Sequence, residues 1–179
     1  MADPEPVVIA SPSIGPRAKV LVSGCLNGPG IRFNGTNVEV ESPIWDRWAA
    51  EGRLVPFCAE LSAGFVVPRP PAEILGGDGT AVICGVGTVV EDTGEDVTDM
   101  FMEGAQNAVA HALEHGCVAA VLTDGSPSCG STYIYNGSFS GGIREGAGVV
   151  AQLLIDNGIR VFSEDQLEDA DRFIRENGE

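Results

Sequence analysis

Three cysteines are the first candidates for chemistry, because each stands where a short apolar segment gives way to a loop rich in glycine or proline. The apolar segments are 18–24, 53–57 and 117–124. The cysteines that follow them are Cys25, Cys58 and Cys129. Cys129 lies in "GSPSCGS", where small residues and a proline predict a tight turn that leaves the sulfur uncovered. The question is whether three thiols so far apart in sequence serve one site.

Three converging thiolates have two main uses in proteins. They could hold a zinc ion with an open fourth position. They could also hold a [4Fe–4S] cluster, which usually takes four cysteines, so that one iron would lack a protein ligand and be an open Lewis acid. The many nearby glycines favour the bulkier cluster. Simple burial is the alternative for each thiol alone, and we expect Cys84, in mid-strand, and Cys117, at a strand start, to pack in the core.

Several polar residues accompany these cysteines. Glu60 stands two positions after the second cysteine, where a carboxylate could act as acid or base; the alternative is an ordinary solvated side chain. Ser126 and Ser128 could orient a ligand or a water, although serine routinely makes hydrogen bonds within turns. Arg32 and Arg69 are candidates for binding an anionic or carbonyl-bearing ligand, with surface salt bridges as the alternative.

Two further pairs deserve comparison with known sites. Cys25 and Arg32 resemble the ends of the phosphate-binding loop of a thiol phosphatase. Six residues separate them, one more than in that loop, and Pro29 lacks one of the required N–H groups. His111 and His115 lie one helical turn apart, a spacing that can bind metal. That helix needs a solvent face, however, and we expect both histidines to be exposed.

The apolar pattern predicts strands that alternate with helices. The expected strands are 18–24, 53–58, 117–124 and 159–163. The expected helices are 42–51, 98–115, 149–156 and a terminal helix that begins with a capping box of Ser163 and Gln166. Three stretches have weaker patterns: 59–74 is expected as a loop, 80–92 as a bent strand or small hairpin, and 132–146 as a loop with hairpin character.

This alternation predicts an α/β fold, with a single-domain parallel sheet of the Rossmann or flavodoxin kind and helices on both faces. Ligands of such sheets bind at the carboxyl ends of the strands, and the three cysteines of the strand ends would meet on that rim. Residues 1–17, with four prolines, are expected to form a flexible tail, and residues 18–179 to form the domain.

Composition limits the partners. The 179-residue chain has a net charge of −16 with ten scattered basic residues, which disfavours unaided binding to long nucleic acid and favours a small-molecule ligand. No apolar run reaches the roughly 18 residues that span a bilayer. The chain starts without a signal-peptide pattern, so we expect a cytoplasmic protein with no membrane partner. The five cysteines include no CxxC pair, and we expect free thiols rather than disulfides.

Longer blocks of sequence carry a family resemblance. "VLVSGCLNGPGIRFNG", "RLVPFCAELSAGFVVPRPPAEI", "GEDVTDMFMEGA", "SPSCGSTYIYNGSFSG" and "GVVAQLLIDNGIRVFSE" resemble, in this order, the successive blocks of the thiouracil desulfidase family. The resemblance runs from about residue 18 to residue 166. It implies a single-domain α/β enzyme that binds a [4Fe–4S] cluster through the three cysteines of the matching positions, which are Cys25, Cys58 and Cys129.

The resemblance also implies a reaction. It is a non-redox, hydrolytic C–S cleavage that converts a thiolated pyrimidine to uracil and hydrosulfide, with the substrate sulfur on the open iron. The substrate would be 2- or 4-thiouracil, or its nucleoside or nucleotide. Glu60 matches the last position of the family's Cys-Pro-Glu and could take a proton from water. Ser126 could position substrate or relay a proton, and we favour it over Ser128.

The sequence departs from the family pattern at several positions, none of which removes a proposed cluster ligand. Ala59 replaces the usual proline, and Gly125 stands where relatives commonly carry a basic residue. Loss of that charge favours a free base over a phosphorylated nucleotide. The alternatives from other classes are a non-catalytic iron–sulfur or zinc sensor, which would more often carry a DNA-binding element, and the phosphatase-like enzyme.

Overall fold

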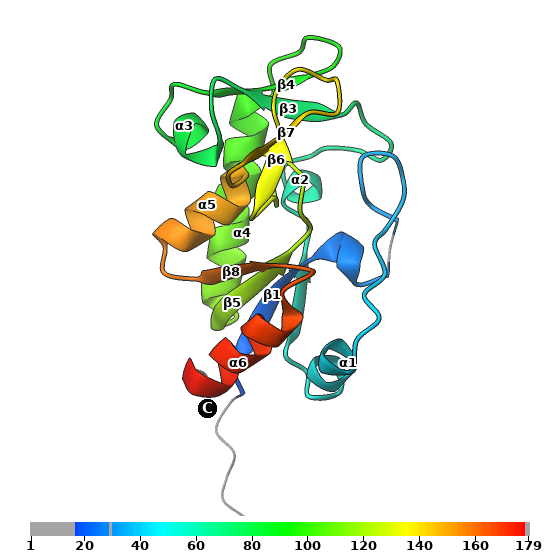
Figure 1. Ribbon diagram of the computed structural model, residues 1–179, viewed down its shortest axis with the longest axis vertical. Helices are drawn as coiled ribbons and strands as arrows, with labels where there is room; N and C mark the ends of the chain where they lie inside the picture. The colour runs from blue at the N-terminus through cyan, green and yellow to red at the C-terminus, as the bar shows by residue number, and fades with distance from the viewer. Residues whose placement is uncertain (1–16, 29, 178–179) are drawn as a thin grey trace, which may run out of the picture.

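The computed structural model describes residues 17–28 and 30–177, so the expected tail 1–17 lies almost wholly outside the described residues. Its centre is a four-stranded, all-parallel sheet in the order β2-β1-β5-β8 (Figure 1). The strands are β1 (Lys19–Ser23), β2 (Leu54–Phe57), β5 (Cys117–Leu122) and β8 (Arg160–Ser163). The predicted α/β fold with a parallel sheet is confirmed.

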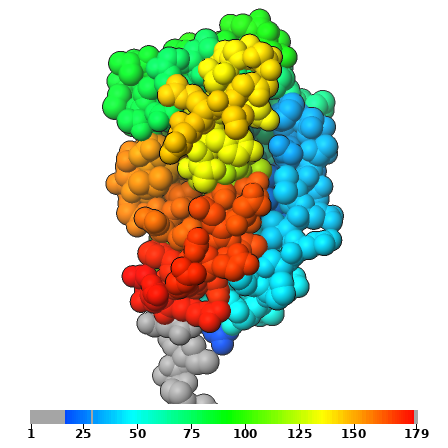
Figure 2. All heavy atoms as spheres, in the orientation of Figure 1, coloured from blue at the N-terminus to red at the C-terminus, as the bar shows by residue number. Residues whose placement is uncertain are grey.

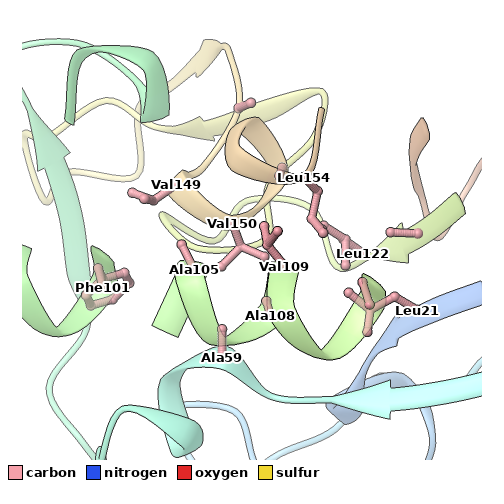
Figure 3. Close-up of a cluster of buried hydrophobic side chains, with 14 of the residues drawn as sticks. Leu21, Ala59, Phe101, Ala105, Ala108, Val109, Leu122, Val149, Val150 and Leu154 are labelled. Atoms are coloured by element: carbon pink, nitrogen blue, oxygen red, sulfur yellow. The ribbon is translucent and has the colours of Figure 1, made fainter. Parts of the chain in front are cut away.

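Helices cover both faces of this sheet, as predicted from the apolar strands. The long helix α4 (Thr98–Glu114) and α5 (Val149–Asp156) share one apolar cluster with alternate strand residues such as Leu21 and Leu122 (Figure 3). Helices α1 (Pro43–Ala50) and α6 (Leu167–Asn177) pack with the residues in between, such as Val20. Each buried Val or Leu contributes about 1.5–3 kcal/mol, so these two clusters supply the main stabilisation of the fold.

The ends of the helices follow local signals in the sequence. The Ser42 hydroxyl accepts a hydrogen bond from Ile44 N at 3.2 Å, directly before Pro43 begins α1. The predicted capping box of the terminal helix is wrong in its placement: Ser163 N donates to Gln166 Oε1 at 3.0 Å, but Ser163 is the last residue of β8, and α6 begins only at Leu167.

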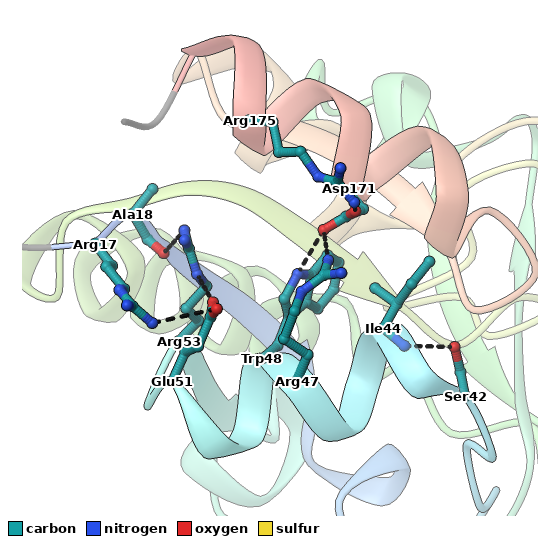
Figure 4. A network of polar contacts seen from close by, with 10 residues as sticks. All are labelled: Arg17, Ala18, Ser42, Ile44, Arg47, Trp48, Glu51, Arg53, Asp171 and Arg175. Atoms are coloured by element: carbon teal, nitrogen blue, oxygen red, sulfur yellow. Dashed lines mark hydrogen bonds and ion pairs between the residues drawn. The ribbon is translucent and has the colours of Figure 1, made fainter.

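An ion-pair network joins α1 to α6 (Figure 4). The carboxylate of Asp171, which is 4% exposed, accepts hydrogen bonds from Trp48 Nε1 at 3.0 Å and from the guanidinium groups of Arg47 and Arg175. Among the described residues of α6, Asp171 is the only buried carboxylate. The network therefore fixes the terminal helix to the first one.

Short elements form a second layer at the end of the molecule where the parallel strands finish (Figures 1 and 2). Strands β3 (Ala72–Leu75) and β4 (Thr88–Glu91) pair antiparallel, as do β6 (Tyr133–Tyr135) and β7 (Ile143–Glu145). The second pair confirms the hairpin character of 132–146. The remaining short helices are η1 (Gly24–Leu26), α2 (Ala59–Ser62) and α3 (Gly79–Ile83).

Two sequence-based expectations for this layer were wrong. The range 59–74, expected as a loop, contains α2 and the start of β3, and the range 80–92, expected as a bent strand or hairpin, contains most of α3 and then β4. The Asp78 carboxylate accepts hydrogen bonds from Thr80 N and Ala81 N and so starts α3. Strands β3 and β4, which flank α3 in the sequence, pair with each other. The local periodicity of a sequence does not predict a pairing between two separate segments.

The two remaining cysteines differ from each other. Cys117 is buried at the start of β5, which confirms its predicted place in the core. Cys84 was expected in mid-strand but ends α3 and is exposed, because the chain there forms a helix. None of the described helices is long and apolar enough to cross a membrane.

Candidate functional site

A cavity of about 420 Å³ opens between the carboxyl ends of the parallel strands and the second layer. All five cysteines lie in the described part of the chain, and the cavity wall includes three of them: Cys25, Cys58 and Cys129. The tertiary structure therefore brings the three predicted residues to one place. The parallel topology does this, because it puts the ends of β1, β2 and β5 on one edge of the sheet.

Each of these cysteines is held by a different local structure. Cys25 lies in the helical turn after β1, and its Sγ is 3.1 Å from Thr123 Oγ1 at the end of β5. Cys58 is the N-cap residue of α2. Cys129 lies in a turn where Gly130 N donates to Ser126 O at 2.9 Å.

Burial raises the pKa of each of the three thiols. The effect is largest for Cys129, whose pKa stands well above its usual range; after burial, the charges of Cys25, Glu60 and Cys58 raise it further. Three thiolates cannot share this cavity without a compensating cation. A metal centre supplies that charge and binds soft thiolate sulfur, so the donor set and the roomy cavity fit an iron–sulfur cluster.

The raised pKa of Cys25 also bears on the phosphatase alternative. A thiol phosphatase needs a thiol whose pKa is depressed, so that it is a nucleophile at neutral pH. Burial acts in the opposite direction here, although the charge of Arg32 and the hydrogen bond from Thr123 offset part of the effect. The geometry therefore does not support phosphatase chemistry at Cys25.

The predicted base, Glu60, is held by an ion pair. Its Oε2 lies 2.7 Å from Nε and 2.5 Å from Nη2 of Arg69, whose side chain is 6% exposed. Arg69 also donates to the carbonyl oxygens of Ile31 and Val66 at 3.1–3.3 Å. Glu60 lines the cavity beside the cysteines, and Arg69 connects it to two neighbouring loops.

The two predicted serines have different positions. Ser126 lines the cavity, and its Oγ accepts hydrogen bonds from Ser128 N at 3.0 Å and from Cys129 N at 3.2 Å. Ser128 is 1% exposed and is not part of the cavity wall. Its carbonyl accepts hydrogen bonds from the first turn of α5, so the residue fixes the turn to that helix. Because Ser128 is buried outside the cavity wall, its side chain is not accessible for the predicted contact with substrate.

The two predicted arginines also differ. Arg69 uses its guanidinium for Glu60 and for backbone carbonyls, as described above. Arg32 is half-buried in the cavity wall, and within the described residues its side chain has no hydrogen bond or ion pair. The guanidinium N–H groups of Arg32 are thus available to donate hydrogen bonds to a ligand.

Sequence reasoning missed several wall residues, above all Glu73, Tyr133 and Tyr135. Glu73 Oε2 accepts hydrogen bonds from Gly137 N at 2.8 Å and Phe139 N at 3.1 Å, which holds the β6–β7 loop next to β3. These residues belong to β3 and β6, which the sequence pattern did not resolve as strands. No local signal marks them as site residues.

An α/β protein with three thiols on one cavity has the donor set of a soft metal or iron–sulfur centre. The chain belongs to the 2-thiouracil desulfurase family, whose model matches residues 20–166. It is 46% identical over 150 residues to the uncharacterized protein YbbK of Bacillus subtilis (strain 168), covering 84% of this chain and 98% of that one. It is also similar to the solved structure of the [4Fe-4S]-dependent thiouracil desulfidase TudS, with 42% identity and a TM-score of 0.77 over 86% of this chain and 95% of the other.

Proposed function

We propose that this protein is a [4Fe–4S]-dependent thiouracil desulfidase whose cluster is held by Cys25, Cys58 and Cys129. The single observation that carries the proposal is the convergence of these three thiols on one cavity. Membership of the 2-thiouracil desulfurase family and the likeness to TudS support it. When bound, the cluster supplies an iron without a protein ligand, a soft Lewis acid that attracts thiocarbonyl sulfur and polarises the C=S bond.

The overall reaction is a hydrolysis without change of oxidation state. A water oxygen replaces the thiocarbonyl sulfur on the ring carbon, and the sulfur leaves as hydrosulfide. Glu60 is the proposed base, since its carboxylate is the one nearest to a cluster cysteine in sequence and it lines the same cavity. Arg69 holds the Glu60 carboxylate in place, which replaces the substrate contact predicted for Arg69.

Ser126 and Arg32 are the proposed substrate contacts. The Ser126 Oγ accepts two backbone N–H groups, so its own hydrogen remains available to donate to a ring carbonyl or to pass to a leaving group. The Arg32 guanidinium can donate to a carbonyl oxygen of the pyrimidine. Aromatic side chains of Phe57, Phe65 and Tyr133 in the wall suit a flat ring.

The charge of the wall favours a neutral substrate. Four carboxylates line the cavity, and only two arginines accompany them, of which Arg69 is paired with Glu60. The carboxylates are Glu60, Glu73, Glu91 and Asp124. A 5′-phosphate would meet this excess of negative charge, so we propose the free thiouracil base as the preferred substrate.

The first experiment measures iron and acid-labile sulfide in anaerobically purified protein, then hydrosulfide release from 2- and 4-thiouracil. We expect about four of each per chain and release of hydrosulfide together with uracil. A cluster without turnover would favour the sensor alternative. Protein that binds zinc but no iron, even after anaerobic reconstitution, would contradict the proposal.

A further inference from the structure

The chain has two histidines, and both lie at the carboxyl end of α4, outside the three-cysteine cavity. His111, Glu114 and His115 each offer one ligand atom, and these atoms all lie within 4.8 Å of one another. Residues three and four positions apart share one face of a helix, so this juxtaposition follows from the spacing. The proposed desulfidase reaction uses none of the three.

The hydrogen bonding of His115 leaves one ring nitrogen ready to bind a metal. Its Nδ1 lies 2.8 Å from the carbonyl oxygen of His111, which can only accept a hydrogen bond. In the neutral imidazole the proton is therefore on Nδ1, and Nε2 keeps its lone pair. Metal-binding histidines commonly have this arrangement, in which a hydrogen bond to a backbone carbonyl fixes the tautomer and the orientation of the ring.

Ring contacts hold the other imidazole in place. The His111 ring stacks on Phe57, with 4.7 Å between centroids and 26° between planes. The two imidazole centroids are 4.1 Å apart. His111 is half-buried, while Glu114 and His115 are exposed. Two held imidazoles and one adjustable carboxylate, that of Glu114, are thus available on the surface of the protein.

We propose that His111, Glu114 and His115 form a binding site for a divalent transition-metal cation, with Zn²⁺ as the representative. Zinc takes imidazole nitrogen and carboxylate oxygen at about 2.0–2.2 Å, which needs ligand atoms roughly 3.3 Å apart in a tetrahedron. Ligand atoms that already lie within 4.8 Å of one another can reach this spacing by small side-chain rotations. Water completes the fourth position. Phe57 also lines the cavity and precedes Cys58, so the site lies behind the wall of the active centre.

The test measures Zn²⁺ binding by equilibrium dialysis on anaerobic, cluster-loaded protein. A Cys84→Ser background removes the exposed thiol, and the visible absorbance of the cluster shows whether zinc has displaced iron. We expect one zinc per chain, bound at least about tenfold more weakly after His115→Ala or Glu114→Gln, because each removes one of three ligands. Glu103→Gln, an exposed carboxylate on the same helix, is the matched control and should change nothing.

A second readout follows from the composition. With two histidines in the chain, the imidazole ¹⁵N resonances report on this site alone, and zinc should shift those of both residues. The proposal is overturned if zinc leaves both imidazoles unchanged, or if His115→Ala and Glu114→Gln bind zinc as the parent protein does. Both readouts are independent of desulfidase activity. If zinc does not bind here, the proposed desulfidase function is unaffected.

Discussion

Glu60 and Arg69 form an ion pair that orients the proposed base. The pair is nearly buried, with side-chain exposures of 16% for Glu60 and 6% for Arg69. A hydrogen bond from Nε and an ion pair with Nη2 of one guanidinium fix the carboxylate more firmly than a flexible lysine would. The orientation of the proposed base thus depends on the guanidinium of Arg69.

A substitution of Glu60 separates catalysis from cluster binding. Glu60→Gln should keep four iron atoms per chain and lower kcat by about 10²–10⁴-fold, the usual contribution of a general base. Iron content and hydrosulfide release measure the two quantities. Glu168→Gln, an exposed carboxylate on α6, serves as the control. Normal turnover in Glu60→Gln would show that another group takes the proton.

Arg69 is predicted to act through Glu60. Arg69→Lys keeps the positive charge but cannot reproduce the hydrogen bonds to Glu60 and to the carbonyls of Ile31 and Val66. We expect a fall in kcat with little change in KM, and no further loss when Glu60→Gln is added. A rise in KM alone would instead support the substrate contact that the sequence predicted.

Substitutions of Cys129 and Cys84 should have opposite effects on cluster content and activity. Cys129→Ala should lose the cluster and all activity, because Cys129 is one of three thiols on the cavity. Cys84→Ala should keep both, because Cys84 is exposed at the end of α3. Iron analysis and visible absorbance distinguish them. Full activity of the Cys129→Ala protein would refute the proposed cluster site.

At the scale of elements, the contact of α1 with α6 depends on one buried carboxylate. Burial raises the pKa of Asp171, but hydrogen bonds from Arg47, Arg175 and Trp48 outweigh this and lower it below 3.8. A group whose pKa is lower in the folded state stabilises the protein above the unfolded pKa, and this stabilisation is lost as pH falls through the folded value. Asp171 should therefore contribute to the acid limb of unfolding, below about pH 3.8.

Removing that charge tests the element. Asp171→Asn should lower the free energy of unfolding by about 2–3 kcal/mol, between the values for exposed and buried pairs. It should also weaken the dependence of stability on pH in the acid range. Asp169→Asn on the same helix, whose pair with Arg172 is exposed, should cost less than about 1 kcal/mol. Equal losses in the two variants, measured by urea unfolding, would argue against a special role for Asp171.

At the scale of the whole molecule, the net charge of −16 acts on any charged substrate. Anions are repelled from the protein and from its acidic cavity, whereas a neutral base is not. We expect kcat/KM for the 5′-monophosphate of thiouridine to be lower than for thiouracil and to rise with salt, because ions screen the repulsion. The value for the free base should stay constant. A faster reaction with the nucleotide at low salt would contradict the proposed preference.

The sequence by itself determined the central sheet, because alternating strands and helices with strong apolar periodicity need no distant information. It also predicted that the three cysteines and Glu60 lie on one cavity, because a residue that follows a buried strand lies at the carboxyl edge of a parallel sheet. The helix cap at Ser42 was equally local, whereas the predicted start of the terminal helix at Ser163 was too early, because α6 begins at Leu167.

Only the tertiary structure decided the second layer and the distribution of roles within the site. Strands β3 and β4 exist through mutual pairing, and the acidic and aromatic wall that they and β6 supply has no local signature. The burial of Ser128 likewise depends on contact with α5, a later segment of the chain, and the pairing of Arg69 with Glu60 depends on how the loop between these two residues folds. Periodicity reports which face of an element is buried, whereas the partner that buries it is fixed only when the elements pack.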